Sequence, residues 1–186
     1  MNGVVRRDQR GFTLIELMIG MLLGLIILGG VLTIYSSVHH TSLIKQRLDS
    51  AQEAVRYGHY TISRLVHNAD EFANGSDADT LVLGYPSSIS NVDGCTGGAI
   101  SGTTSTAFST LNGRLRCDGN DIALGVDDID FEYGIVNDSG NWQITAAADA
   151  TSVKVTLTIQ PHEDFAERDV TFIATMRNAI LAKDNG

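Results

Sequence analysis

The chain has 186 residues, enough for one domain and an appendage, and its 13 basic and 22 acidic residues give a net charge of −9. The first eleven residues hold three Arg and one Asp, so the rest carries 10 basic and 21 acidic residues, a balance of −11. Such a balance repels the phosphate backbone of nucleic acids. The closest basic pair, Arg114 and Arg116, is followed at once by Asp118 and Asp121. We therefore expect no direct nucleic-acid site.

An apolar run dominates the N-terminal part of the chain. No Asp, Glu, Lys or Arg occurs from Leu17 to Ile44, and Leu, Ile, Met, Val and Gly dominate residues 17–38. About 20 such residues suffice to cross a bilayer as a helix. Three arginines against one aspartate precede the run, which favours a cytoplasmic N-terminus. We predict a single-pass segment, with everything after it on the far side of the membrane.

Glu16 is the unusual residue at the start of this run. A charged side chain near the centre of a spanning helix costs about 2.5–3.5 kcal/mol, whereas a helix N-terminus favours an anion by about 0.3–1 kcal/mol. The carboxylate still needs a partner. If the chain were cut between Gly11 and Phe12, the new amino group of Phe12 would lie about one helical turn from Glu16. That amine could meet its own Glu16 or that of a neighbouring subunit.

The segment Gly11-Phe12-Thr13-Leu14-Ile15-Glu16-Leu17-Met18 resembles the class III signal of type IV prepilins and type II secretion pseudopilins. The resemblance implies that a prepilin peptidase cuts after Gly11 and methylates the amine of Phe12. It also implies that Glu16 neutralises the amine of an adjacent subunit during filament assembly. The alternative is an ordinary signal peptide or membrane anchor. An ordinary secretory signal is cut after its apolar run at a small-x-small pair, and none is found between residues 29 and 42.

Beyond the apolar run, the pattern changes to a single apolar stripe at helical spacing, from Ile44 to Phe72. We predict one helix from Phe12 to about Phe72, because no Pro occurs before Pro86. The stripe could serve a coiled coil, but we favour packing on the chain's own sheet. Gly20 and Gly24 form a G-x-x-x-G that either marks a helix interface or arises by chance.

The segment after the helix reads as a turn, a short strand and a long loop. Asn74-Gly75-Ser76-Asp77 is typical of a turn, and Thr80–Tyr85 of a strand. From Pro86 to Thr110, 15 of 25 residues are Ser, Thr or Gly, which predicts a loop. Cys95 and Cys117, on the far side of the membrane, predict a disulfide that would stabilise the fold by about 3 kcal/mol. Two unpaired buried thiols are the alternative.

The remaining chain alternates apolar and polar residues with a period of two, in 129–135, 153–159 and 170–176, with a turn at 137–140 leading into 142–144. Such alternation is typical of antiparallel sheet with one buried face. We predict an α+β fold, a long N-terminal helix packed on antiparallel sheet. The expected parts are a leader (1–11), the transmembrane or filament-core half of the helix (12–43) and a periplasmic or extracellular domain (44–186).

Three further segments resemble PilW-type minor pilins, namely Gln52–Tyr57, Gly125–Gly134 and Met176-Arg177-Asn178. This resemblance implies a type IV pilin-like fold and a minor pilin that joins other minor pilins and the major pilin. Such a protein sits in the inner membrane before assembly and afterwards at the pilus tip and cell surface. Thr33 stands where major pilins commonly carry Pro. The related pseudopilin J of type II secretion and a membrane-anchored adhesin with a Ser/Thr-rich ligand-binding loop are the alternatives.

Residues that could carry chemistry do not form a recognisable set. His59 and His67 lie eight apart on the helix, and His39-His40 follow the apolar run, with no completing ligands nearby. Asp127, Asp128 and Asp130 belong to an alternating strand, so a calcium site there would need a bulge. No G-x-S-x-G nucleophile motif occurs. We expect no catalysis, no cofactor and no metal site.

Overall fold

The structure is a computed structural model, and it describes residues 13–87, 89, 92–100, 105–137, 139–159 and 166–177. The predicted leader and the predicted processing residues Gly11 and Phe12 lie outside this part. The chain divides after Leu43 into two compact units, 1–43 and 44–186. A single helix, α1 (Leu14–Asn68), contains the apolar run and most of the apolar stripe that follows it.

Helix α1 ends at Asn68, four residues before the predicted end at Phe72. The Asn68 side chain donates a hydrogen bond to the Arg64 carbonyl (2.7 Å), and the next residues turn away from the helix. Phe72 belongs instead to β1 (Glu71–Phe72), where it pairs with Leu83 and remains 5% exposed. The apolar spacing in the sequence continues beyond the end of α1 because Phe72 enters the same core from strand β1.

The first sheet has five strands in chain order, all antiparallel: β1, β2 (Leu81–Gly84), β3 (Thr106–Thr110), β4 (Arg114–Cys117) and β5 (Asn120–Leu124). Strand β3 corrects the sequence analysis, which placed its residues in a loop. Thr106 and Phe108 point inward with exposed fractions of 2% and 0%. The short apolar alternation at Thr106–Phe108 was obscured by the Ser, Thr and Gly that surround it.

The second sheet has four antiparallel strands in the order β7-β6-β8-β9. Their bounds are β6 (Asp128–Val136), β7 (Trp142–Ile144), β8 (Ser152–Ile159) and β9 (Arg168–Thr175), and a short 3-10 helix, η1 (Ala147–Asp149), precedes β8. The predicted alternation is confirmed in β6 and β8, whose inward residues are buried: Ile129, Phe131, Tyr133, Val153, Val155, Leu157 and Ile159.

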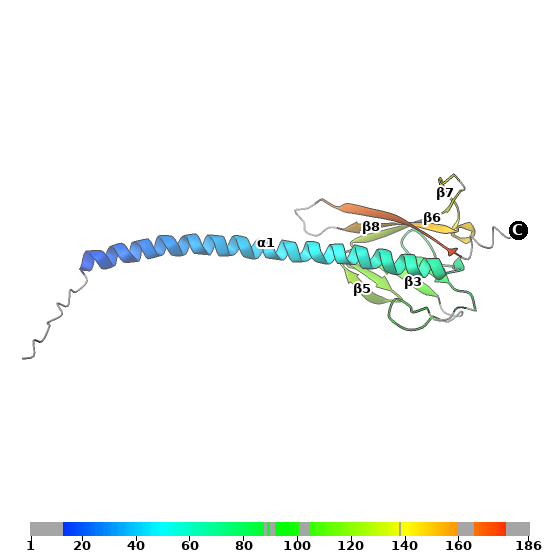
Figure 1. The fold of residues 1–186 in the computed structure, drawn as a ribbon, viewed down its shortest axis with the longest axis horizontal. Coiled ribbons are helices and arrows are strands. Elements are labelled where there is room, and N and C mark those ends of the chain that lie inside the picture. The colour runs from blue at the N-terminus through cyan, green and yellow to red at the C-terminus, as the bar shows by residue number, and fades with distance from the viewer. Residues whose placement is uncertain are drawn as a thin grey trace, which may run out of the picture. The chain divides into compact units, whose positions relative to one another are not determined.

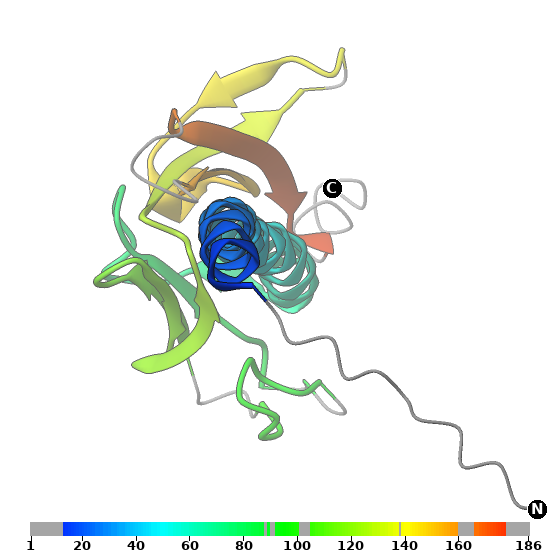
Figure 2. The ribbon, with the colours of Figure 1, turned by 90° about the vertical axis from the view of Figure 1, so that its left-hand side faces the viewer.

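Within unit 44–186 the second half of α1 lies between the two sheets, with β3 and β5 on one side and β6 and β8 on the other (Figures 1 and 2). Ile62, Leu65 and Val66 are fully buried in this core, so the helix packs on its own sheets as expected. Among the described residues, every buried apolar side chain lies between Ala51 and Met176. The unit therefore has a complete core of its own. The α+β fold is confirmed and is consistent with a type IV pilin-like fold.

Gly134 on β6 is required by close packing. A Cβ placed there would lie 2.7 Å from Trp142 Cζ2 and would collide with the Gln143 carbonyl oxygen on the paired strand. We predict that Gly134→Ala lowers the free energy of unfolding by about 1–3 kcal/mol, because the β6–β7 pair must separate. Urea unfolding of residues 44–186 measures this. Gly98→Ala is the matched control, since its Cβ would meet nothing within 4 Å. An equal loss in both variants would contradict the packing argument.

The buried tyrosines Tyr133 and Tyr85 should make the domain less stable at alkaline pH. Tyr133 donates hydrogen bonds toward the carbonyls of Asp77 and Thr80 (both 3.1 Å), and burial raises the pKa of each tyrosine to about 12. Below pH 10 both phenols are protonated in the folded and unfolded states, so stability is unaffected. Between pH 10 and 12 the unfolded phenols lose protons that the folded ones keep, which favours unfolding.

We therefore predict that the unfolding free energy of residues 44–186 falls as pH rises from 10 to 12, by at most about 3 kcal/mol per tyrosine. Tyr133→Phe should cost about 1 kcal/mol at pH 7 through its lost hydrogen bonds. The same variant should also show a shallower decline above pH 10. Urea titrations at pH 8, 10 and 12 measure both effects. A wild-type stability that stays level across this window would contradict the prediction.

Candidate assembly site

The start of α1 places Glu16 in its first turn. Thr13 precedes the helix, and its carbonyl accepts hydrogen bonds from the amides of Glu16 (3.1 Å) and Leu17 (3.2 Å). The Thr13 hydroxyl also accepts from the Glu16 amide at 3.4 Å. Thr13 is therefore the N-cap, and Thr13-Leu14-Ile15-Glu16 has the S/T-x-x-E pattern of a capping box. Sequence reasoning missed this signal, although the four residues display it.

This geometry gives the Glu16 carboxylate two possible roles. The helix N-terminus carries a partial positive charge and unpaired amides, which favour a carboxylate in the first turn by about 0.3–1 kcal/mol. The second role is the predicted pairing with an amine at Phe12, which lies outside the described residues. A local cap and a neighbour's amine make different predictions for Thr13 variants, because only the cap depends on the Thr13 hydroxyl.

The segment that follows is apolar on every side and unburied within the described chain. Its most apolar 18-residue window has a mean hydropathy of 2.6, so by length and composition it could cross a membrane. Its large side chains are more than half exposed, from Leu14 (80%) to Val38 (62%). A continuous apolar surface of this size needs a lipid or protein environment. A Cβ added to Gly20 or Gly24 would meet nothing within 4 Å, so the subunit itself gives neither glycine a packing role.

The structure joins Cys95 to Cys117 by a disulfide, with the two Cα atoms 6.3 Å apart. The bond links the segment after β2 to the end of β4, and Cys117 is fully buried. Arg64 of α1 supports the same segment by donating to the Asp93 carbonyl (2.5 Å). Cys95, Cys117 and Asp118 form a cluster among the described residues in which the two sulfurs and a carboxylate oxygen lie within 4.8 Å of one another, as metal ligands would. Since both sulfurs are bonded to each other, this cluster serves the fold.

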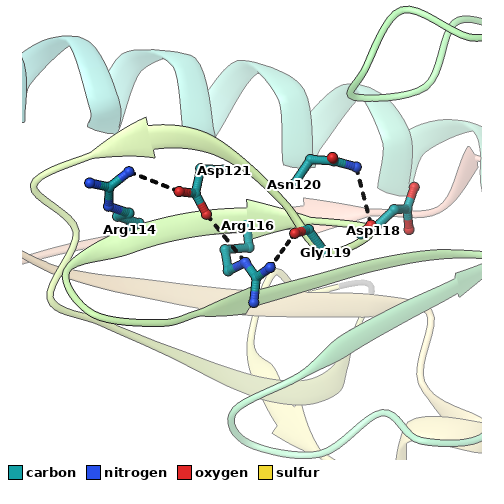
Figure 3. Close-up of polar contacts among 6 residues, drawn as sticks. All are labelled: Arg114, Arg116, Asp118, Gly119, Asn120 and Asp121. Atoms are coloured by element: carbon teal, nitrogen blue, oxygen red, sulfur yellow. Dashed lines mark hydrogen bonds and ion pairs between the residues drawn. The ribbon is translucent and has the colours of Figure 1, made fainter.

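The turn after Cys117 closes a hairpin between β4 and β5 (Figure 3). Asp118 and Gly119 both have positive φ (50° and 78°), as a two-residue hairpin turn requires. Asp121 pairs with Arg114 (2.9 Å) and with Arg116 (3.3 Å). Both arginines therefore lie beside a carboxylate. Asp121 therefore offsets part of the positive charge of Arg114 and Arg116.

His59 and His67 of α1 contact strand β9 rather than each other. The His59 ring packs edge-to-face on Phe172 with centroids 4.6 Å apart. His67 Nδ1 lies 3.3 Å from the Thr175 carbonyl oxygen. On β6 the outward Asp128 carboxylate accepts a hydrogen bond from the Ile129 amide (2.9 Å). These residues thus have structural contacts within the described domain.

Comparison with known proteins bears on the N-terminal segment. Residues 6–32 match the family model for the prokaryotic N-terminal methylation motif. This motif supports a type IV pilin or pseudopilin family. The match includes Gly11, Phe12 and Glu16 and ends inside the apolar helix. No curated protein and no solved structure matches the chain.

The motif and the fold together suggest a structural, non-enzymatic protein. A prepilin motif implies processing by prepilin peptidase and assembly with other pilins. Together with the apolar helix, it fits a pilin anchored in the inner membrane before assembly. Glu16, the N-terminus of α1 and the apolar surface behind them are therefore the candidate residues for assembly.

Proposed function

We propose that this chain is a minor pilin of a type IV pilus, resembling the PilW type, that joins other minor pilins in a tip complex and primes pilus assembly. Prepilin peptidase cleaves it between Gly11 and Phe12 and methylates the Phe12 amine. The apolar half of α1 anchors the chain in the inner membrane and then enters the filament core. The observation that carries the proposal is the methylation motif at residues 6–32, with a carboxylate in the first turn of an apolar helix.

The mechanism follows from charge and burial. In a filament core the Glu16 carboxylate and the Phe12 amine would both be costly if left alone, because a charge removed from water needs a partner. An amine from one subunit placed against Glu16 of the next removes both costs together. Because the pairing joins two subunits, it favours one particular axial offset between neighbouring α1 helices.

The minor-pilin assignment draws on the segments Gln52–Tyr57 and Gly125–Gly134. Gly125 has φ 87°, and a Cβ there would lie 3.5 Å from the Ala51 Cα. The glycine lets the chain pass closely under α1 as it crosses from β5 to β6. This crossing joins the two sheets around the helix. The resemblance of the two segments to minor pilins is loose, and it extends to a J-type pseudopilin of type II secretion.

The test is recovery of the full-length chain with its assembly partners. Epitope-tagged protein expressed in its own cells should be recovered with other minor pilins and the major pilin from sheared filaments. Deletion of the gene should abolish piliation and leave export of folded enzymes intact. Loss of enzyme export with normal piliation would contradict the pilus assignment and support the pseudopilin alternative.

A further inference from the structure

The outer face of the second sheet, turned away from α1, carries the only tryptophan of the chain. Trp142 of β7 lies opposite Val136 of β6, and Glu132 of β6 lies opposite Lys154 of β8. Because the alternate residue Tyr133 is buried in the core, Glu132 and the residues that share its face point to solvent. Figure 2 shows the β6–β7 pair reaching beyond the other strands of this sheet.

The indole of Trp142 is held in one position on this face. It lies against the backbone of Gly134, where a Cβ would come within 2.7 Å of Cζ2 and 2.9 Å of Cε2. Its Nε1 donates a hydrogen bond to Glu132 Oε1 (3.0 Å). Lys154 forms an ion pair with the same carboxylate, and its Nζ lies 5.9 Å from the indole centroid. These contacts fix the ring without burying it, since Trp142 remains partly exposed.

The surroundings of the indole combine apolar side chains with hydrogen-bonding groups. Val136 (39% exposed) and Ile144 (72% exposed) extend the apolar surface along the β6–β7 pair. Toward the opposite end of the sheet, the same face carries carboxylates and hydroxyls, from Asp128, Asp130, Thr156, Thr158, Asp169 and Thr171. The Thr156 and Thr171 hydroxyls lie 3.3 Å apart. A flat aromatic ring thus adjoins rows of hydrogen-bond donors and acceptors.

The charge of this face limits the class of ligand. Its carboxylates outnumber its cations among the described residues, because Lys154 is the basic side chain there and is already paired with Glu132. Phosphate, sulfate and uronic acid groups would therefore be repelled. The centre of a protein–protein interface is depleted of charged residues, so a face with four carboxylates fits a protein partner poorly. A neutral ligand with an apolar face and a rim of hydroxyls fits it best.

We propose that the indole of Trp142 and the outer face around it bind a neutral oligosaccharide. A pyranose ring presents C–H groups on its faces and hydroxyls at its rim. The C–H groups pack on the exposed part of the indole, while the hydroxyls exchange hydrogen bonds with Asp130, Thr156 and Thr171. Because the indole is already fixed, little side-chain entropy is lost on binding. This inference goes beyond the proposed function and does not rest on it.

Intrinsic fluorescence provides the first test, because Trp142 is the only tryptophan and reports on this face alone. Residues 44–186, which have a complete core of their own, are titrated with cellohexaose, maltohexaose or N-acetylchitohexaose. At least one of these neutral sugars should give a saturable change in emission intensity at millimolar concentration. A heparin hexasaccharide, which is strongly anionic, should give none. Full-length chain in lipid nanodiscs should respond in the same way.

Retention on beads that carry the bound sugar then compares variants. Trp142→Leu keeps an apolar side chain over Gly134 but removes the flat ring, so retention should fall about tenfold. Trp142→Phe keeps an aromatic face and should stay within about threefold of the wild type. Thr156→Val/Thr171→Val, which removes two hydroxyls, should also weaken retention. Tyr60→Ala is the matched control, because it removes an aromatic ring that is 63% exposed on α1. Its retention should equal that of the wild type.

Thermal unfolding of each variant shows whether the domain is still folded. The proposal is overturned if none of the three neutral sugars gives a saturable change in the folded wild-type domain. Equal retention of wild type and Trp142→Leu would overturn it as well, and so would binding of the heparin hexasaccharide in place of the neutral sugars. If the chain is recovered from filaments but binds no sugar, this inference alone fails. If it binds sugar but is not recovered from filaments, the sugar site stands and the proposed function fails.

Discussion

Glu16→Gln should leave cleavage and membrane insertion intact but reduce recovery of the chain with partner pilins at least tenfold. The isosteric amide keeps the size of the side chain and removes the charge that would neutralise a neighbour's Phe12 amine. Breaking a buried ion pair by removing one partner typically costs about 3–5 kcal/mol, and tenfold corresponds to only about 1.4 kcal/mol. Co-purification from solubilised membranes, with equal input of mature chain, measures the effect.

Thr13→Ala is the control that separates pairing from helix capping. It removes the hydroxyl that accepts a hydrogen bond from the Glu16 amide at 3.4 Å and keeps the Glu16 carboxylate. Loss of an N-cap costs about 0.5–2 kcal/mol of helix stability, which a long helix in a membrane or filament absorbs. We expect Thr13→Ala to assemble nearly normally. Wild-type recovery of Glu16→Gln, or equal defects in both variants, would refute the pairing mechanism.

Removal of the disulfide should produce the largest loss of domain stability. Cys95 and Cys117 are 22 positions apart, and closing such a loop stabilises a fold by about 3 kcal/mol on the chain-entropy account. We predict that Cys95→Ala/Cys117→Ala lowers the unfolding free energy of residues 44–186 by this amount. The midpoint of thermal unfolding should fall by roughly 6–12 °C.

Reduction of the wild-type fragment provides the matched comparison, because it opens the same loop without changing a side chain's size appreciably. Thermal and urea unfolding monitored by circular dichroism should then give similar losses for the reduced wild type and the double variant. A loss below about 1 kcal/mol in both would show that Arg64 and the surrounding contacts hold the segment without the covalent link.

The elements that could be predicted from the sequence are those whose apolar and polar residues follow a long, regular pattern. The apolar run, the alternation in β6 and β8 and the turn before β7 each depend on local chemistry repeated over many residues. Strand β3 was missed because the short alternation at Thr106–Phe108 lies among Ser, Thr and Gly, and its pairing with β2 and β4 joins segments that are separate in sequence. The end of α1 was misplaced because Phe72 supplies the same core from a different element.

The candidate site was only partly accessible from sequence for a similar reason. Glu16 could be identified from sequence because a carboxylate at the start of an apolar segment costs free energy in a membrane and in a protein core. Its capping partner Thr13 was overlooked, although the local T-x-x-E spacing displays it. The grooves that lie between α1 and β5, and between α1 and strands β8 and β9, could not be predicted, because they depend on which strands end the two sheets.

Mass spectrometry of the N-terminal peptide of the mature chain, purified from its own cells, tests the central claim most directly. We expect a chain that begins at Phe12 and carries a methyl group on its amine. A functional chain that retains its first eleven residues, or one cleaved after the apolar segment, would contradict it.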